Sequence, residues 1–276
     1  MRAILCALLI AGLAASAAHA DGLPVLGIDV GAQGITVPGA RYRYVTAAVG
    51  HDTIVARVER GNGRVRRSRI LRGSLTIPAV AYDGSAAGLS ADRASLVLIA
   101  PRDRFPRART PLTVVDTRDL RIRRKIVLRG DFSFDAISPT GQWVYLIHYT
   151  SPTDPLRYQV RVLDTVTGSL MPRPIVDPRE PDERMGGRPL TRTASPDGRW
   201  AYTLYERPGA PPFVHALDTT GRTARCIDLD WLRAPRQLVG VRLVLRDGGQ
   251  VVDVVSRGVT RAVIDTRSLI AARPNR

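Results

Sequence analysis

A short turn sequence recurs along this chain and constrains its fold more than any other feature. The clearest copies read ASPDGRWAY at 194–202 and ISPTGQWVY at 137–145. Weaker copies lie at 89–97, 36–44 and 244–252. Proline presets the backbone of the first turn position, and the glycine that follows accepts a positive φ. An alternating or β-branched run follows, so each copy predicts a hairpin between two strands.

A second signal, an apolar residue followed by Asp-Thr, trails each turn at the distance that two more strands would occupy. It occurs at 115–117, 163–165, 217–219 and 264–266, and the sequence VER at 58–60 is a weaker first member. The two signals keep the same order along the chain. Their period of about 50 residues is typical of the four-stranded blades of propellers.

We therefore predict an all-β fold, a β-propeller of about five four-stranded blades. The predicted blades lie near 31–72, 73–129, 130–187, 188–236 and 237–276, within a single domain of residues 21–276. The orphan strand Pro24–Val30 is expected to pair near Ser268–Ala272 and close the ring, because closure removes exposed sheet edges. Two alternatives remain: a six-bladed ring with one unrecognised blade, and an open array that closes on dimerising.

The turn motif followed by LDTTG at 217–221 resembles the repeats of bacterial β-propellers of the YVTN, lactonase-like and TolB-like families, which are WD-repeat-like. The resemblance covers most of the chain in rhythm, although the third and fourth blades carry the motif best. It implies the propeller fold and no activity, because the same blade serves enzymes, scaffolds and receptors. No family site residue is carried over.

Residues 1–20 have the pattern of a secretory signal peptide. Arg2 is followed by an apolar run at 4–15, and Ala18-His19-Ala20 supplies small residues for cleavage. No later segment is apolar enough to span a membrane, so we expect a protein without a transmembrane segment. It would be exported to the periplasm, the cell surface or the extracellular space. One cysteine, Cys226, would remain after cleavage, which excludes an internal disulfide.

The formal net charge is +16 and the isoelectric point is near 11.1. A basic surface favours negatively charged partners. The competing explanation is the coding bias of a GC-rich genome, since the positive residues are nearly all arginine. Export argues against nucleic acid, so the expected partner is a protein or an anionic envelope polymer.

Catalytic and metal-binding motifs are not evident. The chain has no G-x-S-x-G elbow, and His51, His148 and His215 lack the spacing of metal ligands. We expect no catalytic residue, no metal and no cofactor.

Alignment of the blades on the turn places Asp135, Arg192 and Arg242 three residues before it. This position should lie on the innermost strand, near the central channel. The three side chains could bind a small anion or a carboxylate at the channel mouth. The alternative is a structural ion pair that satisfies buried charge.

Two predicted outer strands are strongly basic. Their basic residues are Arg64, Arg66, Arg67, Arg69 and Arg72, then Arg118, Arg121, Arg123, Arg124, Lys125 and Arg129. Charge on an edge strand discourages edge-to-edge pairing, which is one interpretation. The other is a continuous basic flank that meets anionic envelope polymers or lipid headgroups.

The sequence favours an exported, non-enzymatic binding or scaffold protein that engages anionic envelope components through its arginine-rich flank. The alternative is a lactonase-like or other hydrolase acting at the central mouth, with Asp135, Arg192 and Arg242 as the residues to test first. A purely structural role in a larger envelope complex is a third possibility. The oligomeric state is not indicated.

Overall fold

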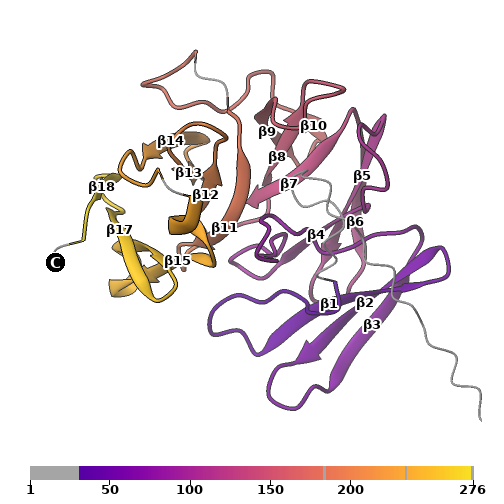
Figure 1. The fold of residues 1–276 in the computed structure, drawn as a ribbon. Helices are drawn as coiled ribbons and strands as arrows, with labels where there is room; N and C mark the ends of the chain where they lie inside the picture. Colours follow the sequence, from indigo (N-terminus) through magenta and orange to yellow (C-terminus); the bar gives the residue numbers. More distant parts are fainter. Residues whose placement is uncertain (1–30, 183–184, 234, 275–276) are drawn as a thin grey trace, which may run out of the picture.

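The computed structural model describes residues 31–182, 185–233 and 235–274, and this part of the chain is built from β-strands. The strands form five antiparallel sheets that contain consecutive segments of the chain. Figure 1 shows the sheets following one another anticlockwise, from β1–β3 at the lower right to β15–β18 at the left. None of the described residues belongs to a helix that is long and apolar enough to cross a membrane.

Each sheet is named here by its order along the chain. Sheet 1 contains β1 (Tyr42–Val49), β2 (Asp52–Glu59) and β3 (Val65–Leu71). Sheet 2 contains β4 (Ser95–Ile99), β5 (Arg109–Asp116) and β6 (Ile122–Arg129). Sheet 3 contains β7 (Phe132–Ile137), β8 (Trp143–Tyr149), β9 (Tyr158–Asp164) and β10 (Ser169–Leu170). Sheet 4 contains β11 (Arg188–Ala194), β12 (Trp200–Glu206), β13 (Phe213–Asp218) and β14 (Thr223–Asp228). Sheet 5 contains β15 (Val241–Arg246), β16 (Val251–Ser256), β17 (Val259–Asp265) and β18 (Ile270–Ala272), with short 3-10 turns at Pro235–Leu238 and Asp247–Gly249.

Sheets 1 and 2 have three strands where the sequence predicted four. Isolated bridges stand in place of the inner strand, joining Ile35 to Tyr44 in sheet 1 and Leu89 to Leu96 in sheet 2. The inner segment of sheet 2 contains Pro78, which has no N–H for a ladder, and Gly88 at φ 108°. These residues interrupt regular pairing, so the segment is held by single bridges.

The predicted hairpin is confirmed in sheets 3, 4 and 5, where the turn joins β7 to β8, β11 to β12 and β15 to β16, whereas in sheets 1 and 2 an isolated bridge stands in its place. In the best copy, β11 ends at Ala194 and β12 begins at Trp200, with Gly198 at φ 72° in the turn between them. The side chain of Asp197 accepts the Arg199 N–H at 3.0 Å, which is the local bond that makes this sequence a turn.

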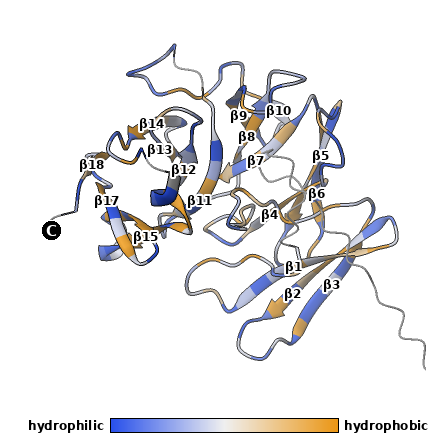
Figure 2. Cartoon of the chain, in the orientation of Figure 1, coloured by the Kyte–Doolittle hydropathy of each residue, from blue (hydrophilic) through white to orange (hydrophobic). Residues whose placement is uncertain are grey.

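The hydrophobic core is divided among the spaces between consecutive sheets. Tyr202 and Leu204 of sheet 4, for example, pack with Leu243 and Val254 of sheet 5. Similar clusters join sheets 1 and 2, sheets 2 and 3, and sheets 3 and 4. Hydrophobic and hydrophilic residues alternate along many strands, whereas β3 is largely hydrophilic (Figure 2). Burial between neighbouring sheets therefore holds the array together.

A hairpin at 79–86, before β4, reaches past sheet 3 to sheet 4. Its ends are joined by a bridge between Ala79 and Ala86. The Tyr82 N–H donates to the Pro189 carbonyl at 2.9 Å, and the Asp83 N–H donates to the Leu190 carbonyl at 3.2 Å. The segment that precedes β4 is thus bonded directly to β11 of sheet 4.

Two sequence predictions fall outside the described residues. These are the signal peptide at 1–20 and the ring-closing strand Pro24–Val30.

Candidate functional site

The structure brings Asp135 and Arg192 together and leaves Arg242 apart from them. The Nη1 atom of Arg192 lies 2.7 Å from the Oδ1 atom of Asp135, and it also donates a hydrogen bond to the Asp135 carbonyl. Both side chains are buried, with 7% and 3% exposed. Arg242, on β15, is exposed, and among the described residues no hydrogen bond or ion pair joins it to the other two.

The inner ends of the sheets surround a cavity of about 200 Å³ near this pair. Its lining comes from residues 35–38, 85–89, 91, 136–137, 192–196, 198 and 201. Among these lining residues Arg192 alone is charged, and it is already bound to Asp135. The lining includes the hydroxyls of Ser85 and Ser195 but no histidine, cysteine or carboxylate, so the described part of this cavity holds no general base that could activate them.

In the described part of the chain, no group of three or more His, Cys, Asp or Glu side chains is close enough together to hold a metal ion.

The basic residues named from the sequence lie on β3, on β6 and in the turns beside them. These strands are the outermost strands of sheets 1 and 2. Every residue of β3 except Leu71 is exposed, as are residues 122–125 of β6. Exposed arginines on two consecutive outer strands give this side of the molecule a high density of positive charge.

Three of these arginines are neutralised by carboxylates. Arg66 binds Glu59 at 2.5 Å, Arg123 binds Asp116 at 2.5 Å, and Arg121 lies 3.3 Å from Asp119. The others have no carboxylate partner among the described residues. They are Arg64, Arg67, Arg69, Arg72, Arg118, Arg124, Lys125 and Arg129.

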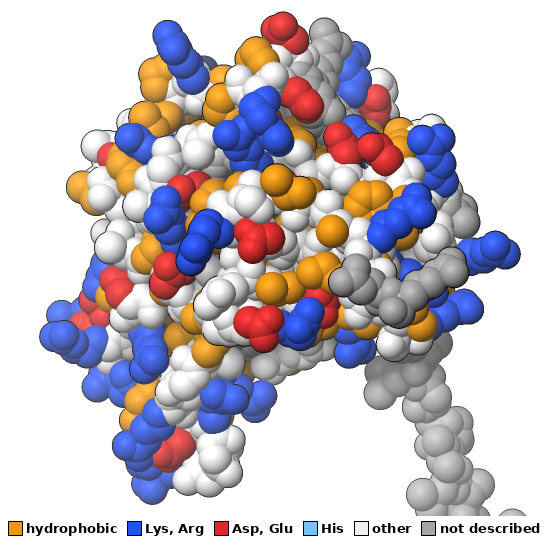
Figure 3. Space-filling model, turned by 90° about the vertical axis from the view of Figure 1, so that its left-hand side faces the viewer, with side chains coloured by type: hydrophobic (Ala, Val, Ile, Leu, Met, Phe, Trp, Pro, Cys, Tyr) orange, Lys and Arg blue, Asp and Glu red, His pale blue; other side chains and the backbone are white. Residues whose placement is uncertain are grey.

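Positive charge is also present on other faces. On the side where β15–β18 lie, arginines are interspersed with acidic side chains (Figure 3). The distinguishing feature of β3 and β6 is therefore the shortage of acidic partners, and not the presence of arginine alone.

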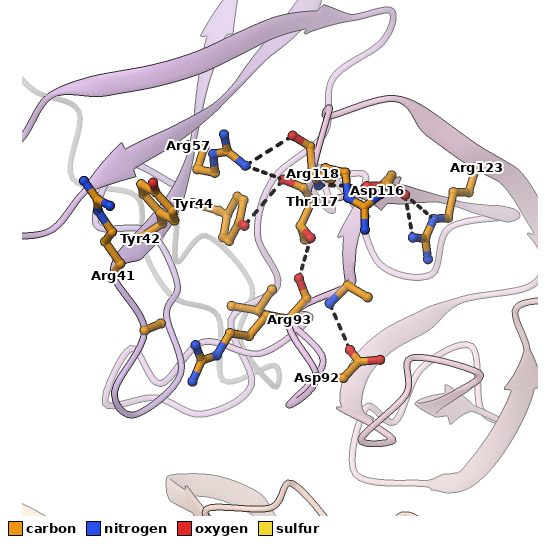
Figure 4. Close-up of a pocket in the computed structure, with 13 residues that line it drawn as sticks. Arg41, Tyr42, Tyr44, Arg57, Asp92, Arg93, Asp116, Thr117, Arg118 and Arg123 are labelled. Atoms are coloured by element: carbon orange, nitrogen blue, oxygen red, sulfur yellow. Dashed lines mark hydrogen bonds and ion pairs between the residues drawn. The ribbon is translucent and has the colours of Figure 1, made fainter.

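A cleft of about 550 Å³ opens between sheets 1 and 2, beside these strands. Figure 4 shows the side chains that line it from both sheets. Its charged lining residues are Arg41, Arg57, Arg93, Arg118 and Arg123, with Asp92 and Asp116. A volume of this size is within the range of small-molecule sites.

Arg57 is fixed at the back of the cleft by contacts with its neighbours. Its Nη1 donates to the carbonyls of Thr117 and Arg118, at 3.5 and 3.2 Å. Its guanidinium also lies over the Tyr42 ring, 4.9 Å from the centroid. The Nε atom is buried without a hydrogen-bond partner. The side chain is thus held in place by neutral groups, and its charge is not cancelled.

Arg41 and Arg123 differ from Arg57 because each has a carboxylate partner. The hydrogen bond from Arg41 lowers the pKa of Glu59 below its ordinary value. Partial burial acts to raise the pKa of Asp116, but hydrogen bonds from Arg123 and the Arg118 N–H lower it overall. Both carboxylates are therefore ionised at neutral pH, and these two arginines are paired.

The sequence analysis included Arg118 and Arg123 in the predicted basic flank. It did not identify Arg41, Arg57 and Arg93, which also line this cleft. Arg57 lies on β2, the strand next to β3, and its register partner there is Arg67. Residues directly opposite in an antiparallel pair share a face, so the predicted flank continues onto β2.

No protein-family model matches the chain, and no curated protein matches it in sequence. A functionally unknown protein from Desulfotomaculum acetoxidans is similar in structure, with a TM-score of 0.54, 15% identity, and coverage of 92% of this chain and 73% of that one. The Dos1 propeller has a TM-score of 0.50 and 13% identity, with coverage of 87% of this chain and 57% of that one. TolB from Acinetobacter baumannii has a TM-score of 0.46 and 13% identity and is matched over 85% of this chain. The match spans 51% of that TolB chain, about half its length. The fold is of the β-propeller type, and these likenesses extend to the fold alone.

Proposed function

We propose that this protein is an exported, non-enzymatic β-propeller that binds an anionic envelope polymer through the outer strands of sheets 1 and 2. The observation that carries the proposal is the group of exposed arginines on β3 and β6 that have no carboxylate partner among the described residues, which are Arg67, Arg69, Arg124 and Arg129. Arginine matches the geometry of phosphate, sulfate and carboxylate groups through its planar set of donors. A polymer with repeated negative groups would bridge several of them at once.

Protection of sheet edges is the competing explanation for the same residues. A few charges are enough to prevent edge-to-edge pairing. The arginines here exceed that need, and they continue inward to Arg57 and Arg93 in the cleft, away from any strand edge. Their distribution favours recognition of a partner.

Binding is favoured over catalysis by the composition of the central cavity. Its one charged lining residue, Arg192, is bound to the buried Asp135. A hydrolase working at this mouth would need a general base to activate a serine or a water molecule. The described lining has serine hydroxyls but no histidine or carboxylate to serve as that base.

The proposed export depends on the leader pattern at 1–20, and it implies a place in the periplasm, at the cell surface or outside the cell. We infer also that the five sheets are blades with the limits expected from the repeat, and that Pro24–Val30 completes the last one. These inferences need direct tests: N-terminal sequencing of the secreted protein for the first, and cross-linking of cysteines placed at Val25 and Ala271 for the second.

The binding proposal is tested by capture on immobilised polyanions of defined chemistry, at low and at high salt. The variant Arg67→Glu/Arg69→Glu should weaken capture about tenfold, since each surface charge contributes a few tenths of a kcal/mol to about 1 kcal/mol. The control Arg173→Glu/Arg236→Glu makes the same charge change outside sheets 1 and 2, at exposed positions. Equal losses in both variants would show a general charge effect and would contradict the proposed site.

A further inference from the structure

One position in the turn of sheet 2 carries an arginine where the equivalent turns of sheets 3, 4 and 5 carry glycine. A shared hydrogen bond, from a threonine hydroxyl to a turn carbonyl, defines the equivalence. Thr117 donates to Arg93 in sheet 2, Thr165 to Gly141 in sheet 3, Thr219 to Gly198 in sheet 4 and Thr266 to Gly249 in sheet 5. Arg93 is thus the non-glycine residue of this set.

The backbone at this position is left-handed in all four sheets. The φ angles are 64° at Arg93, 78° at Gly141, 72° at Gly198 and 103° at Gly249. Glycine adopts this region without cost, whereas the Cβ of an L-residue is strained there. Strain of this kind can persist at functional sites, but other turns of this chain also hold a non-glycine residue with positive φ, among them Leu120 and Arg257, so the position of Arg93 in the cleft carries the argument.

The strained residue lines the cleft between sheets 1 and 2. There it joins Arg57 and Arg118, and none of the three has a carboxylate partner among the described residues. Figure 4 shows that they come from three separate segments: β2, the turn before β4 and the turn after β5. Three arginines from three segments therefore line one cavity, although the Arg93 guanidinium extends away from Arg57 and Arg118 (Figure 4).

We infer that this cleft binds a phosphate group, with Arg57, Arg93 and Arg118 as its ligands. The inference rests on the proposed function, because it makes the cleft the place where individual phosphates of the anionic polymer are recognised. The paired residues Arg41 and Arg123 form the walls and keep their own carboxylates satisfied.

Phosphate fits the cleft better than a carboxylate does. It presents three or more acceptor oxygens in different directions, whereas a carboxylate presents two in one plane. Arginines from different segments can each meet a separate oxygen once the exposed Arg93 side chain turns toward Arg57 and Arg118. A group of charge near −2 also matches a lining in which five arginines face two aspartates.

The simpler explanation is that an arginine is tolerated at position 93 because nothing crowds it. At Gly141 a Cβ would lie 2.6 Å from the Ser95 Cβ, and at Gly198 it would lie 2.8 Å from the Ala91 Cβ. Those turns need glycine for space as well as for conformation. The two explanations of Arg93 differ in what its replacement by glycine should do to binding.

The experiment is Arg93→Gly, measured by titration calorimetry with inorganic phosphate and by thermal unfolding. We expect affinity for phosphate to fall at least about tenfold, as for loss of one charge-assisted contact. The melting temperature should stay the same or rise, because glycine relieves the left-handed strain. Loss of binding without loss of stability is a result that misfolding cannot produce.

The matched control is Arg257→Gly. Arg257 is also an exposed arginine with positive φ, at 51°, and it lies in the turn between β16 and β17, away from the cleft. This control should keep the parent's affinity for phosphate. A second cleft variant, Arg118→Ala, should weaken phosphate binding as Arg93→Gly does. Acetate should bind the parent much more weakly than phosphate.

The source of the phosphate is separated by two further probes, polyphosphate and phosphatidylglycerol vesicles. If polyphosphate binds, and its binding needs both Arg93 and the β3 arginines, the phosphate belongs to a polymer as proposed. If the protein binds the vesicles and not polyphosphate, the phosphate belongs to a lipid headgroup and the proposed polymer is contradicted. The inference is overturned if the parent does not bind phosphate or if Arg93→Gly binds it unchanged. If Arg67→Glu/Arg69→Glu still weakens binding of the polyanion in that case, the proposed function stands, and the cleft is excluded as the phosphate site.

Discussion

The hydroxyl of Thr219 donates a hydrogen bond of 2.8 Å to the carbonyl of Gly198, and this bond joins the two signals of the sequence repeat. Gly198 belongs to the turn motif, and Thr219 belongs to the Asp-Thr signal that follows it. The aspartate beside it, Asp218, accepts the N–H groups of Thr220 and Gly221 and forms the next turn. The two signals occur together because they are bonded to each other within one sheet.

Sheet 1 makes the same connection with a different side chain. The VER sequence has Arg60 in the place of threonine, and its Nη1 donates to the Ala40 carbonyl at 3.1 Å. The Arg60 N–H donates to the Arg41 carbonyl, as the Thr219 N–H does to Arg199. The bond is therefore retained even where the sequence signal is weak.

Replacement of Thr219 by valine should lower the free energy of unfolding by about 1–2 kcal/mol, because the partly buried Gly198 carbonyl loses its partner. Thr219 is 1% exposed, so water cannot take the place of the hydroxyl. Urea unfolding measures the change. The adjacent Thr220 is exposed, and Thr220→Val should alter stability by no more than about 0.5 kcal/mol. Equal effects at both positions would show that the bond does not hold the repeat together.

A tyrosine of the turn motif connects neighbouring sheets. The Tyr145 hydroxyl donates to the Thr219 carbonyl at 2.9 Å, from sheet 3 to sheet 4. Tyr145→Phe should lower the free energy of unfolding by about 1 kcal/mol, because the bond is buried. The matched control is Tyr82→Phe, since the buried Tyr82 hydroxyl has no hydrogen-bond partner. Its removal should leave stability unchanged or increase it, and a loss equal to that of Tyr145→Phe would contradict the assignment.

The ion pair of Asp135 and Arg192 should be structural. Arg192→Met would leave the Asp135 carboxylate buried and unpaired, at a cost of about 3–5 kcal/mol in the free energy of unfolding. The double variant Asp135→Leu/Arg192→Met should regain most of that loss, because it removes both charges. Urea unfolding of the single and double variants measures the coupling. If the single variant were as stable as the parent, the ion pair would not be needed for folding. Binding of a small anion by Arg192 would then again be a candidate role.

The turns and strands could be predicted because their signals are local. In 195–199, a proline, an aspartate that bonds a nearby N–H and a glycine with positive φ specify the hairpin within five residues. The propeller type followed from repetition of that unit. The same alignment of turns placed Arg93 opposite Gly141 and Gly198, so the signal for the strained arginine was present in the sequence.

The remaining features depend on contacts between distant segments. Nothing in 79–86 indicates that Tyr82 and Asp83 pair with β11, more than a hundred residues later. The cleft exists because sheets 1 and 2 separate beside Arg57 and Arg118, and a strand pattern does not specify the spacing of sheets. Arg242 has the same place in the repeat as Arg192, yet it is exposed, because the repeat fixes the strand position and not the neighbours of a side chain.

The stability of the protein should fall as the pH drops below about 6.5, the ordinary pKa of histidine. Burial lowers the pKa of His215, and the positive charge of Arg192 adds to this effect while Asp135 opposes it. Burial likewise lowers the pKa of His148. Between the lowered values and 6.5 the unfolded chain binds more protons than the folded one, so the free energy of unfolding increases with pH in this window.

Urea unfolding between about pH 5 and pH 8 measures this dependence around the ordinary histidine pKa. His215→Gln should flatten the slope, because glutamine does not titrate and the buried site then favours neither state of protonation. The control His51→Gln changes an exposed side chain at the turn between β1 and β2 and should leave the slope as it is. Since Asp177 and Asp218 have lowered pKa values, their contribution is lost only at more acidic pH, below about 4. If the free energy of unfolding of His215→Gln changed with pH as steeply as that of the parent, the dependence would come from His148 or from groups elsewhere in the chain.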